Sequence, residues 1–127
     1  MPEVTMLGAE FAHALAEKDS NRLRELFAPE IEFQALTPRR TWEASDPEAV
    51  LSILFGHWFE DPDEIEAIEE LDTDSFADRQ RVGYRFSVDN PEGHFLVEQQ
   101  AYLSERDGRI VWMRVLCSGY RAVPSAQ

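Results

Sequence analysis

The chain has 127 residues, 43% of them hydrophobic, so we expect a single globular domain over residues 1–127 with its core at about 5–121. Twelve basic residues against 25 acidic ones give a net charge of −13, which argues against nucleic acid and anionic membranes as partners, because both require a basic surface. The first residues have no basic start and no long apolar run, so we expect neither a signal peptide nor a membrane span, and a cytoplasmic protein.

The first third of the chain predicts two helices and a strand. Apolar residues recur at helical spacing from 5 to 18, which indicates an amphipathic helix. Asp19 and Ser20 are typical helix caps, so a short second helix is expected over residues 21–27, ending before Pro29. The alternation of IEFQAL at residues 31–36 predicts a half-buried strand.

Residues 37–44 are expected to form a loop. Its two adjacent arginines and Trp42 could hold a carboxylate or cover a pocket mouth, the alternative being a solvated loop with an anchoring tryptophan. Pro47 and acids in the next turn predict a third helix over residues 47–59. His57 lies on its apolar stripe, as either a pocket residue or a hydrogen-bonded core histidine.

The remaining chain predicts four strands. Residues 60–74 are acid-rich but contain no glycine for a calcium loop, so we expect an outer strand with charged edge residues and no metal. A strand over residues 80–88 follows, with a turn at 90–93. Residues 94–119 then alternate on both sides of Asp-Gly, a strong signal for a hairpin. The tail from residue 122 is expected to be frayed.

The hairpin register determines which side chains share a face. If Asp107 and Gly108 are the turn residues, counting outward pairs Tyr102 with Met113, Gln100 with Val115 and Glu98 with Cys117. The resulting face is apolar except for a glutamate and a glutamine, an arrangement typical of a ligand pocket, although the same two residues could face solvent. As the chain's only cysteine, Cys117 cannot form an internal disulfide, and we expect it to be a small buried hydrophobe rather than a nucleophile.

Helices followed by antiparallel strands predict an α+β domain with helices on the concave side of a curved sheet. The segments FAHALAEKDSNRLRELFAPEIEF and DGRIVWMRV, in this order of elements, resemble the nuclear transport factor 2-like superfamily, to which SnoaL-like polyketide cyclases and ketosteroid isomerases belong. The resemblance covers about Leu7 to Tyr120. It implies a cone in which three N-terminal helices and a curved mixed or antiparallel sheet enclose a pocket, in a family of both enzymes and non-enzymes.

Compared with ketosteroid isomerase, the chain lacks the three catalytic groups. The resemblance places Phe11 where that enzyme has its tyrosine, Ala35 near its aspartate base and Gln100 at its protonated aspartate. Only the glutamine could still donate a hydrogen bond to a carbonyl oxygen. The sequence therefore argues against steroid isomerisation by that mechanism.

Two functions remain open for a pocket of about 300 Å³ or more. The first is an isomerase, cyclase or hydrolase acting by proton transfer on a small, largely apolar or aromatic molecule. Glu98 would be its acid or base and Gln100 its carbonyl donor, with His57 or Tyr84 assisting. The second is a non-catalytic ligand-binding or dimerisation module. Neither requires a cofactor. Side chains expected to contact the ligand are Phe11, Leu15, Trp42, Ile53, Leu54, Trp58, Tyr84, Phe86, Tyr102, Met113, Val115 and Cys117.

The other hairpin face predicts a homodimer. Leu103, Trp112, Arg114 and Leu116 would form an apolar patch that no other part of the chain covers, and a two-fold axis would let the patch cover itself. The resemblance implies the same, since dimers packed through the sheet are common in this superfamily. The alternative is a monomer in which the long side chains of Arg81, Arg85 and Arg114 shield the patch.

Overall fold

The computed structural model describes residues 7–123, which form an α+β domain. Within this range, helices α1 (Leu7–Ala16) and α2 (Ser20–Leu26) precede the first strand, and helix α3 (Pro47–Ile53) lies between the second and third strands. Its strands are β1 (Phe27–Thr37), β2 (Arg40–Ala44), β3 (Glu64–Phe76), β4 (Arg79–Asn90), β5 (Gly93–Arg106), β6 (Arg109–Cys117) and β7 (Arg121–Ala122). A π-helical turn, η1 (Leu54–Trp58), directly continues α3.

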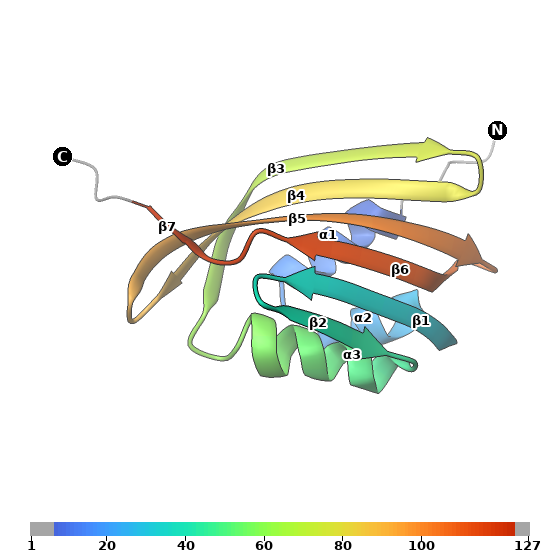
Figure 1. Ribbon diagram of the computed structural model, residues 1–127, viewed down its shortest axis with the longest axis horizontal. Coiled ribbons are helices and arrows are strands. Elements are labelled where there is room, and N and C mark those ends of the chain that lie inside the picture. The colour runs from blue at the N-terminus through green and yellow to red at the C-terminus, as the bar shows by residue number, and fades with distance from the viewer. Residues whose placement is uncertain (1–6, 124–127) are drawn as a thin grey trace.

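The strands form one curved, mixed sheet, and the helices lie on one face of it (Figure 1). The strand order is β2-β1-β6-β5-β4-β3, with β7 beside the start of β5. Every pairing is antiparallel except that of β1 with β6. Helix α1 contacts β3, β4 and β5, while α3 contacts β1 and β2. This arrangement confirms the predicted α+β cone.

The helix signals in the sequence are confirmed where the structure describes them. The carboxylate of Asp19 accepts a hydrogen bond from the backbone N–H of Arg22, so it caps α2 as predicted. Helix α1 continues to Ala16, whereas its predicted start at Thr5 lies outside the described residues. Gly8 lets α1 approach β4 closely, because a Cβ at this position would lie 2.7 Å from Cβ of Val82.

Two predictions in the middle of the chain are wrong. Residues 40–44 form strand β2 instead of a loop, paired with β1 after a tight turn in which Arg39 has a φ of 75°. The third helix does not continue as an α-helix to residue 59, because the backbone N–H of Phe59 donates to the carbonyl of Leu54 in a π-helical bond. The tail was predicted to fray from residue 122, but Ala122 belongs to β7 and pairs with Phe95.

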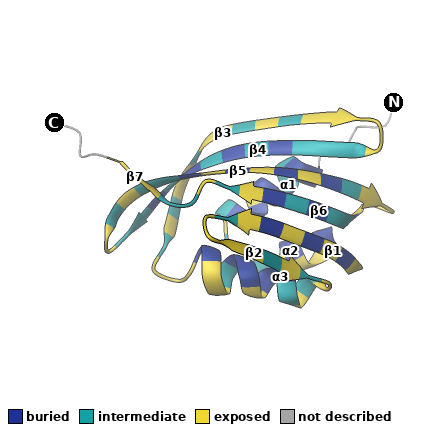
Figure 2. Cartoon of the chain, viewed as in Figure 1, coloured by how far each residue is buried: buried dark blue, intermediate teal, exposed yellow. Residues whose placement is uncertain are grey.

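The core fills the space between the helices and the sheet, and burial alternates along the central strands (Figure 2). Eight of the side chains expected to contact a ligand are buried in this core: Phe11, Leu15, Ile53, Leu54, Tyr84, Phe86, Met113 and Val115. Within residues 7–123, no helix has the length and apolar character needed to span a membrane.

Candidate ligand pocket

The register of the β5–β6 hairpin decides which side chains reach the interior. Asp107 and Gly108 have φ angles of 56° and 78°, as an Asp-Gly turn of two left-handed residues requires. Arg106 then pairs with Arg109 as predicted, but the register shifts just beyond the turn, between Ser104 and Glu105. On β6 the shift passes over Val111, which has no partner on β5, as in a β-bulge.

This one-residue shift makes the predicted pairing of β5 wrong from Ser104 onward. Gln99, and not Glu98, pairs with Cys117, and Tyr102 pairs with Arg114 instead of Met113. Because side chains alternate, the shift exchanges the two faces of β5 but leaves those of β6 as predicted.

Glu98, Gln100 and Tyr102 therefore lie on the outer face of the sheet, and the prediction that they line the interior is wrong. The Glu98 side chain is 48% exposed, and its carboxylate lies 2.9 Å from the guanidinium of Arg85. Gln99 is the polar residue of this segment that is buried, with only 1% of its surface exposed.

An interior cavity of about 170 Å³ lies at the end of the cone where η1, β5 and the end of β6 meet. Four predicted residues border it, namely Trp42, His57, Trp58 and Cys117. Thr37, Phe59, Val97, Gln99, Gly119 and Tyr120 complete its wall.

The cavity is smaller than predicted because aromatic side chains fill the deeper part of the cone. Tyr84 stacks on Phe86 with ring centroids 4.8 Å apart and lies 6.1 Å from the ring of Phe11. The other predicted contact residues in this region belong to the packed core and do not border the cavity: Leu15, Ile53, Leu54 and Met113.

Two residues that border the pocket each carry a buried N–H group without an acceptor. The hydroxyl of Tyr84 donates to Oε1 of Gln99, and this leaves Nε2 of Gln99 without a partner. The indole Nε1 of Trp58, a residue 7% exposed, has no partner either. An unpaired buried donor costs about 1–3 kcal/mol, so these two residues are the places in the pocket wall where an acceptor would add most to stability.

The π-helical turn positions the aromatic mouth of the cavity. Its additional residue changes the direction of the side chains that follow, so that His57 and Trp58 both border the cavity. The ring of Trp42 lies 5.0 Å from that of His57 and is covered on another side by the guanidinium of Arg40, 3.7 Å from the ring centroid.

The segment after β6 closes the far side. Gly119 has a φ of 79°, and a Cβ there would lie 2.8 Å from Cγ of Pro38, so a glycine is needed both for the turn and for the close contact. The turn brings Tyr120 over the cavity, where its hydroxyl donates to the carbonyl of Trp58 over 2.8 Å. Its ring packs 6.1 Å from that of Phe59.

The cavity is poor in charge. Among the described residues that border it, only His57, Cys117 and Tyr120 can titrate. Burial, followed by the nearby Asp63, raises the pKa of Tyr120, so its phenol is neutral at physiological pH. Burial also raises the pKa of Tyr84 well above its ordinary value, which keeps this hydroxyl a donor to Gln99.

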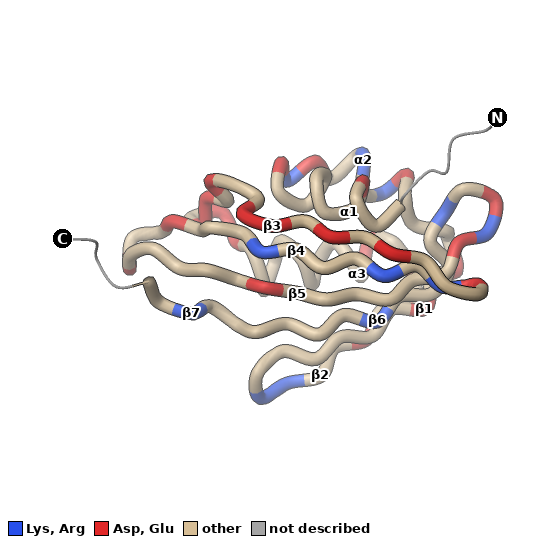
Figure 3. The backbone as a smooth tube through the Cα atoms, turned by 90° about the horizontal axis from the view of Figure 1, so that it is seen from above, with Lys and Arg blue, Asp and Glu red and all other residues tan. Residues whose placement is uncertain are grey.

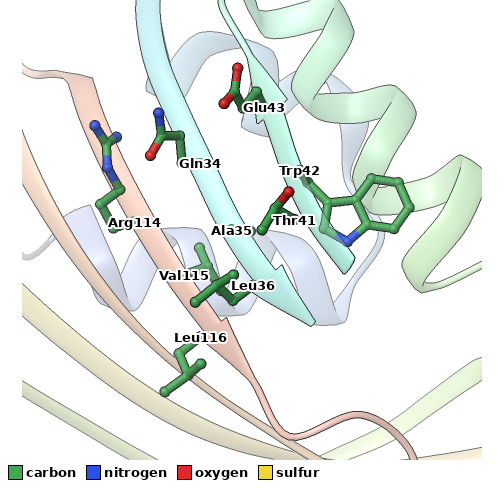
Figure 4. A pocket seen from close by; sticks show the side chains of 9 residues that line it. All are labelled: Gln34, Ala35, Leu36, Thr41, Trp42, Glu43, Arg114, Val115 and Leu116. Atoms are coloured by element: carbon green, nitrogen blue, oxygen red, sulfur yellow. The ribbon is translucent and has the colours of Figure 1, made fainter. Parts of the chain in front are cut away.

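The outer face of the sheet carries shallow grooves on both sides of Leu116. One, of about 420 Å³, is bordered by Gln34 and Leu36 of β1 and by Arg114 and Leu116 of β6 (Figure 4). Val115 and Trp42 also border this groove, although the Trp42 ring turns from β2 toward the helix (Figure 4). The other, of about 450 Å³, contains Glu98, Gln100 and Tyr102. Acids concentrate on β3, whereas β5 and β6 carry few charges (Figure 3).

Known structures share this fold across nearly the whole chain. A proposed isomerase from Rhodopseudomonas palustris superposes with a TM-score of 0.70 at 16% identity, over 94% of this chain and 93% of its own. IdmH, a proposed polyketide cyclase from Streptomyces antibioticus, gives 0.67 at 20% identity, over 87% and 88%. A protein from Catenulispora acidiphila described as having a ketosteroid isomerase-like fold is among the structures that share the fold of this chain.

An LEH-like epoxide hydrolase from M. tuberculosis also shares this fold, with a TM-score of 0.66 at 12% identity over 92% of this chain and 86% of that one. No family model matches the sequence, and no curated protein matches it. The structures that share this fold carry names of different activities, so the function of this chain must be argued from its own pocket.

Gln99 was not predicted to border the pocket, because both faces of β5 are largely apolar in the sequence. Val97, Gln99, Ala101 and Leu103 form an alternating apolar row as convincing as the one chosen, and only the bulge at Val111 selects between them. The one sequence feature that could have indicated it is a single glutamine in a row that is otherwise apolar.

Proposed function

We propose that the interior cavity binds a small, neutral and largely apolar molecule through a carbonyl oxygen. The observation that carries this proposal is that two residues bordering the pocket, Gln99 and Trp58, each hold a buried N–H group without an acceptor, which a ligand would reach by a small movement of either side chain. A carbonyl oxygen has two lone pairs and can accept from both donors. The known structures of this fold include proteins named as enzymes of small molecules, which agrees with a small-molecule pocket.

The lining of the cavity defines the class of ligand. No lysine or arginine is among the described residues that border it, and burying a carboxylate without a cation costs several kcal/mol, so an uncharged carbonyl is favoured. The rings of Trp42, Trp58 and Phe59 suit a flat apolar body. A volume of about 170 Å³ selects a compound with one ring over a steroid or another fused polycycle.

Acetophenone and α-methylstyrene provide the test, because the second replaces the carbonyl oxygen of the first by a CH₂ group of similar shape. Calorimetry should show acetophenone binding at least about tenfold more tightly, since each satisfied donor contributes about 1 kcal/mol or more. Gln99→Met should reduce this preference by about fivefold or more, because only the Trp58 donor remains. Gln100→Met, the same change one residue along on the outer face, should retain it. Equal affinities of the wild type for both compounds would exclude the proposal.

A second candidate function, proton transfer on the bound carbonyl compound, is favoured by His57. Of the four residues predicted to act chemically, it is the one that borders the cavity. Exchange of the acetophenone methyl protons with deuterium from solvent, followed by NMR, measures this activity directly. His57→Gln should abolish the exchange, whereas Glu98→Gln should not change it, because Glu98 lies on the outer face. A loss of exchange in Glu98→Gln alone would instead support the role first predicted for it.

We also propose that a second copy of the chain covers the outer face, but over a different patch from the predicted one. Leu103 is buried inside, and Trp112 is covered by the guanidinium groups of Arg79 and Arg114, 3.8 and 4.4 Å from its ring. The exposed apolar groups on this face include Leu36, Tyr102 and Leu116, and the exposed ring of Phe76 packs against that of Tyr102.

Leu116 is 60% exposed and borders both outer grooves. In a two-fold dimer, Leu116 of the second copy would lie against the same surface. Light scattering at micromolar concentration should show a dimer, and Leu116→Glu should convert it to a monomer. A wild-type monomer under these conditions would leave the arginine-shielded alternative.

A further inference from the structure

Three side chains that can bind a metal ion meet on the outer face of the sheet, away from the cavity. They come from three neighbouring strands, Glu66 from β3, Asp89 from β4 and His94 from β5, and their ligand atoms all lie within 4.8 Å of one another. Asp89 follows Val88, which is buried in the core, so the alternation of β4 turns Asp89 to the outer face. The three side chains are accessible to an ion, being 48%, 38% and 68% exposed in the order named.

The pairing of the strands brings these three groups together. Asp89 pairs directly with His94 across β4 and β5, so their side chains lie on the same face. On β3 a register shift between Ile65 and Ala67 leaves Glu66 without a partner on β4, as in a β-bulge. Although β4 separates β3 from β5, Oε1 of Glu66 lies 3.9 Å from Nδ1 of His94. These two side chains therefore extend over β4 and meet beside Asp89.

The distances between the ligand atoms suit one small cation. Nδ1 of His94 lies 3.0 Å from Oδ1 of Asp89 and 3.9 Å from Oε1 of Glu66. Zinc binds nitrogen and oxygen ligands at about 2.0–2.2 Å with tetrahedral angles, which places neighbouring ligand atoms about 3.3–3.6 Å apart. A small movement of these exposed side chains brings all three atoms to one zinc ion and leaves the fourth position to water.

The two carboxylates of this cluster lack the arginine that a neighbouring acid has. On the same strand, the carboxylate of Glu70 lies 3.5 Å from the guanidinium of Arg85. Within residues 7–123, no lysine or arginine lies within ion-pair distance of Glu66 or Asp89, and both face His94. A neutral imidazole beside two carboxylates is a ligand set with two negative charges, which a divalent metal ion balances.

We propose that Glu66, Asp89 and His94 bind a divalent transition-metal ion such as zinc. The imidazole nitrogen favours zinc over calcium and magnesium, because these two ions take oxygen ligands. The sequence argued against a calcium loop within residues 60–74, whereas only one ligand of this site comes from that stretch. The bound ion joins β3, β4 and β5, and none of its ligands borders the cavity, so the site does not depend on the proposed function.

Calorimetric titration of the full chain with zinc chloride at neutral pH tests the site, and one ion should bind per chain. His94→Gln should weaken binding by at least about tenfold, because even residues that only orient a metal ligand contribute about 10–100-fold to affinity. His13→Gln removes another exposed histidine, on α1, and should leave the affinity unchanged. A wild type that binds no zinc, or equal binding by His94→Gln, would overturn the proposal.

The carboxylates and the choice of ion distinguish this site from a merely acidic surface. Glu66→Gln should also weaken zinc binding by about tenfold or more, whereas Glu70→Gln on the same strand should not. Calcium chloride should bind at least about 100-fold more weakly than zinc chloride, because an imidazole nitrogen is a poor ligand for calcium. Calcium binding as tight as that of zinc, or equal losses in the two glutamate variants, would indicate only a general attraction of cations to acids and refute the site.

Thermal unfolding gives a second readout and shows that each variant folds. Because the substituted side chains are exposed, the metal-free variants should unfold at about the temperature of the wild type. Excess zinc should raise the unfolding temperature of the wild type and of His13→Gln by mass action, but not that of His94→Gln. A rise of equal size in His94→Gln would place the zinc elsewhere on the chain and contradict the assignment.

Discussion

We expect the hydrogen bond between Tyr84 and Gln99 to contribute more to ligand binding than to the net free energy of unfolding. Both side chains are buried, with 1% of each exposed, and the phenol donates to Oε1 of the amide. Tyr84→Phe keeps the ring but leaves Oε1 without its donor. We expect this variant to lose about 1–3 kcal/mol of unfolding free energy, the cost of an unsatisfied buried polar group.

The double variant provides the sharper test. Gln99→Met alone leaves the Tyr84 hydroxyl unpaired, but it also removes the unpaired Nε2, so its loss should be smaller than that of Tyr84→Phe. Tyr84→Phe combined with Gln99→Met replaces the whole polar pair by apolar groups of similar size and should be close to wild type in stability. The coupling energy between the two changes is therefore expected to be at least about 1 kcal/mol.

Urea denaturation followed by tryptophan fluorescence measures all four proteins under one set of conditions. Because the chain is small and of one domain by its fold, a two-state analysis should apply. Additive losses in the double variant, within about 0.5 kcal/mol, would refute the reasoning that the pair is stabilised only by being mutually satisfied. A double variant as stable as the wild type that discriminates acetophenone less well would show that the pair serves ligand binding.

Three further predictions concern the frame of the pocket. Phe86→Ala should lose about 3–5 kcal/mol in the same urea experiment, because it leaves a cavity beside Tyr84 and Phe59; a loss under 1 kcal/mol would contradict the packing described. Gly8→Ala should lose about 1–3 kcal/mol through its overlap with Val82, whereas Gly56→Ala, where a Cβ meets only Ser52 Oγ at 3.8 Å, should be tolerated. Because the pKa of Tyr84 is raised in the folded protein, the unfolded chain releases this proton first, and the free energy of unfolding should fall as pH rises above the ordinary tyrosine value of 10.0. The fall should be shallower in Tyr84→Phe. Identical slopes in both proteins would contradict this prediction.

The sequence by itself determined the elements that rest on local physical preferences. The helix cap at Asp19, the Asp-Gly turn and the order of helices before strands depend on backbone conformation and short-range hydrogen bonds, and all are present in the structure. The apolar positions of α1, α3, β4 and β6 point inward because each has one face that is clearly more apolar than the other. The resemblance to the superfamily added the cone.

The tertiary structure alone decided which face of β5 forms the pocket. Both faces of this strand are largely apolar in sequence, so burial energy does not choose between them, and the choice depends on whether β6 accommodates an extra residue at Val111. That bulge moved Glu98 and Gln100 to the outer face and Gln99 to the interior.

The π-helical turn and the size of the cavity were also decided by the tertiary structure and not by the local sequence. A π-helical bond at Phe59 and the stacking of Tyr84 on Phe86 result from how separate elements meet, and no periodicity in a single segment encodes them. Local sequence therefore specifies the elements, whereas the polar groups of the pocket are set by contacts between residues far apart in the chain.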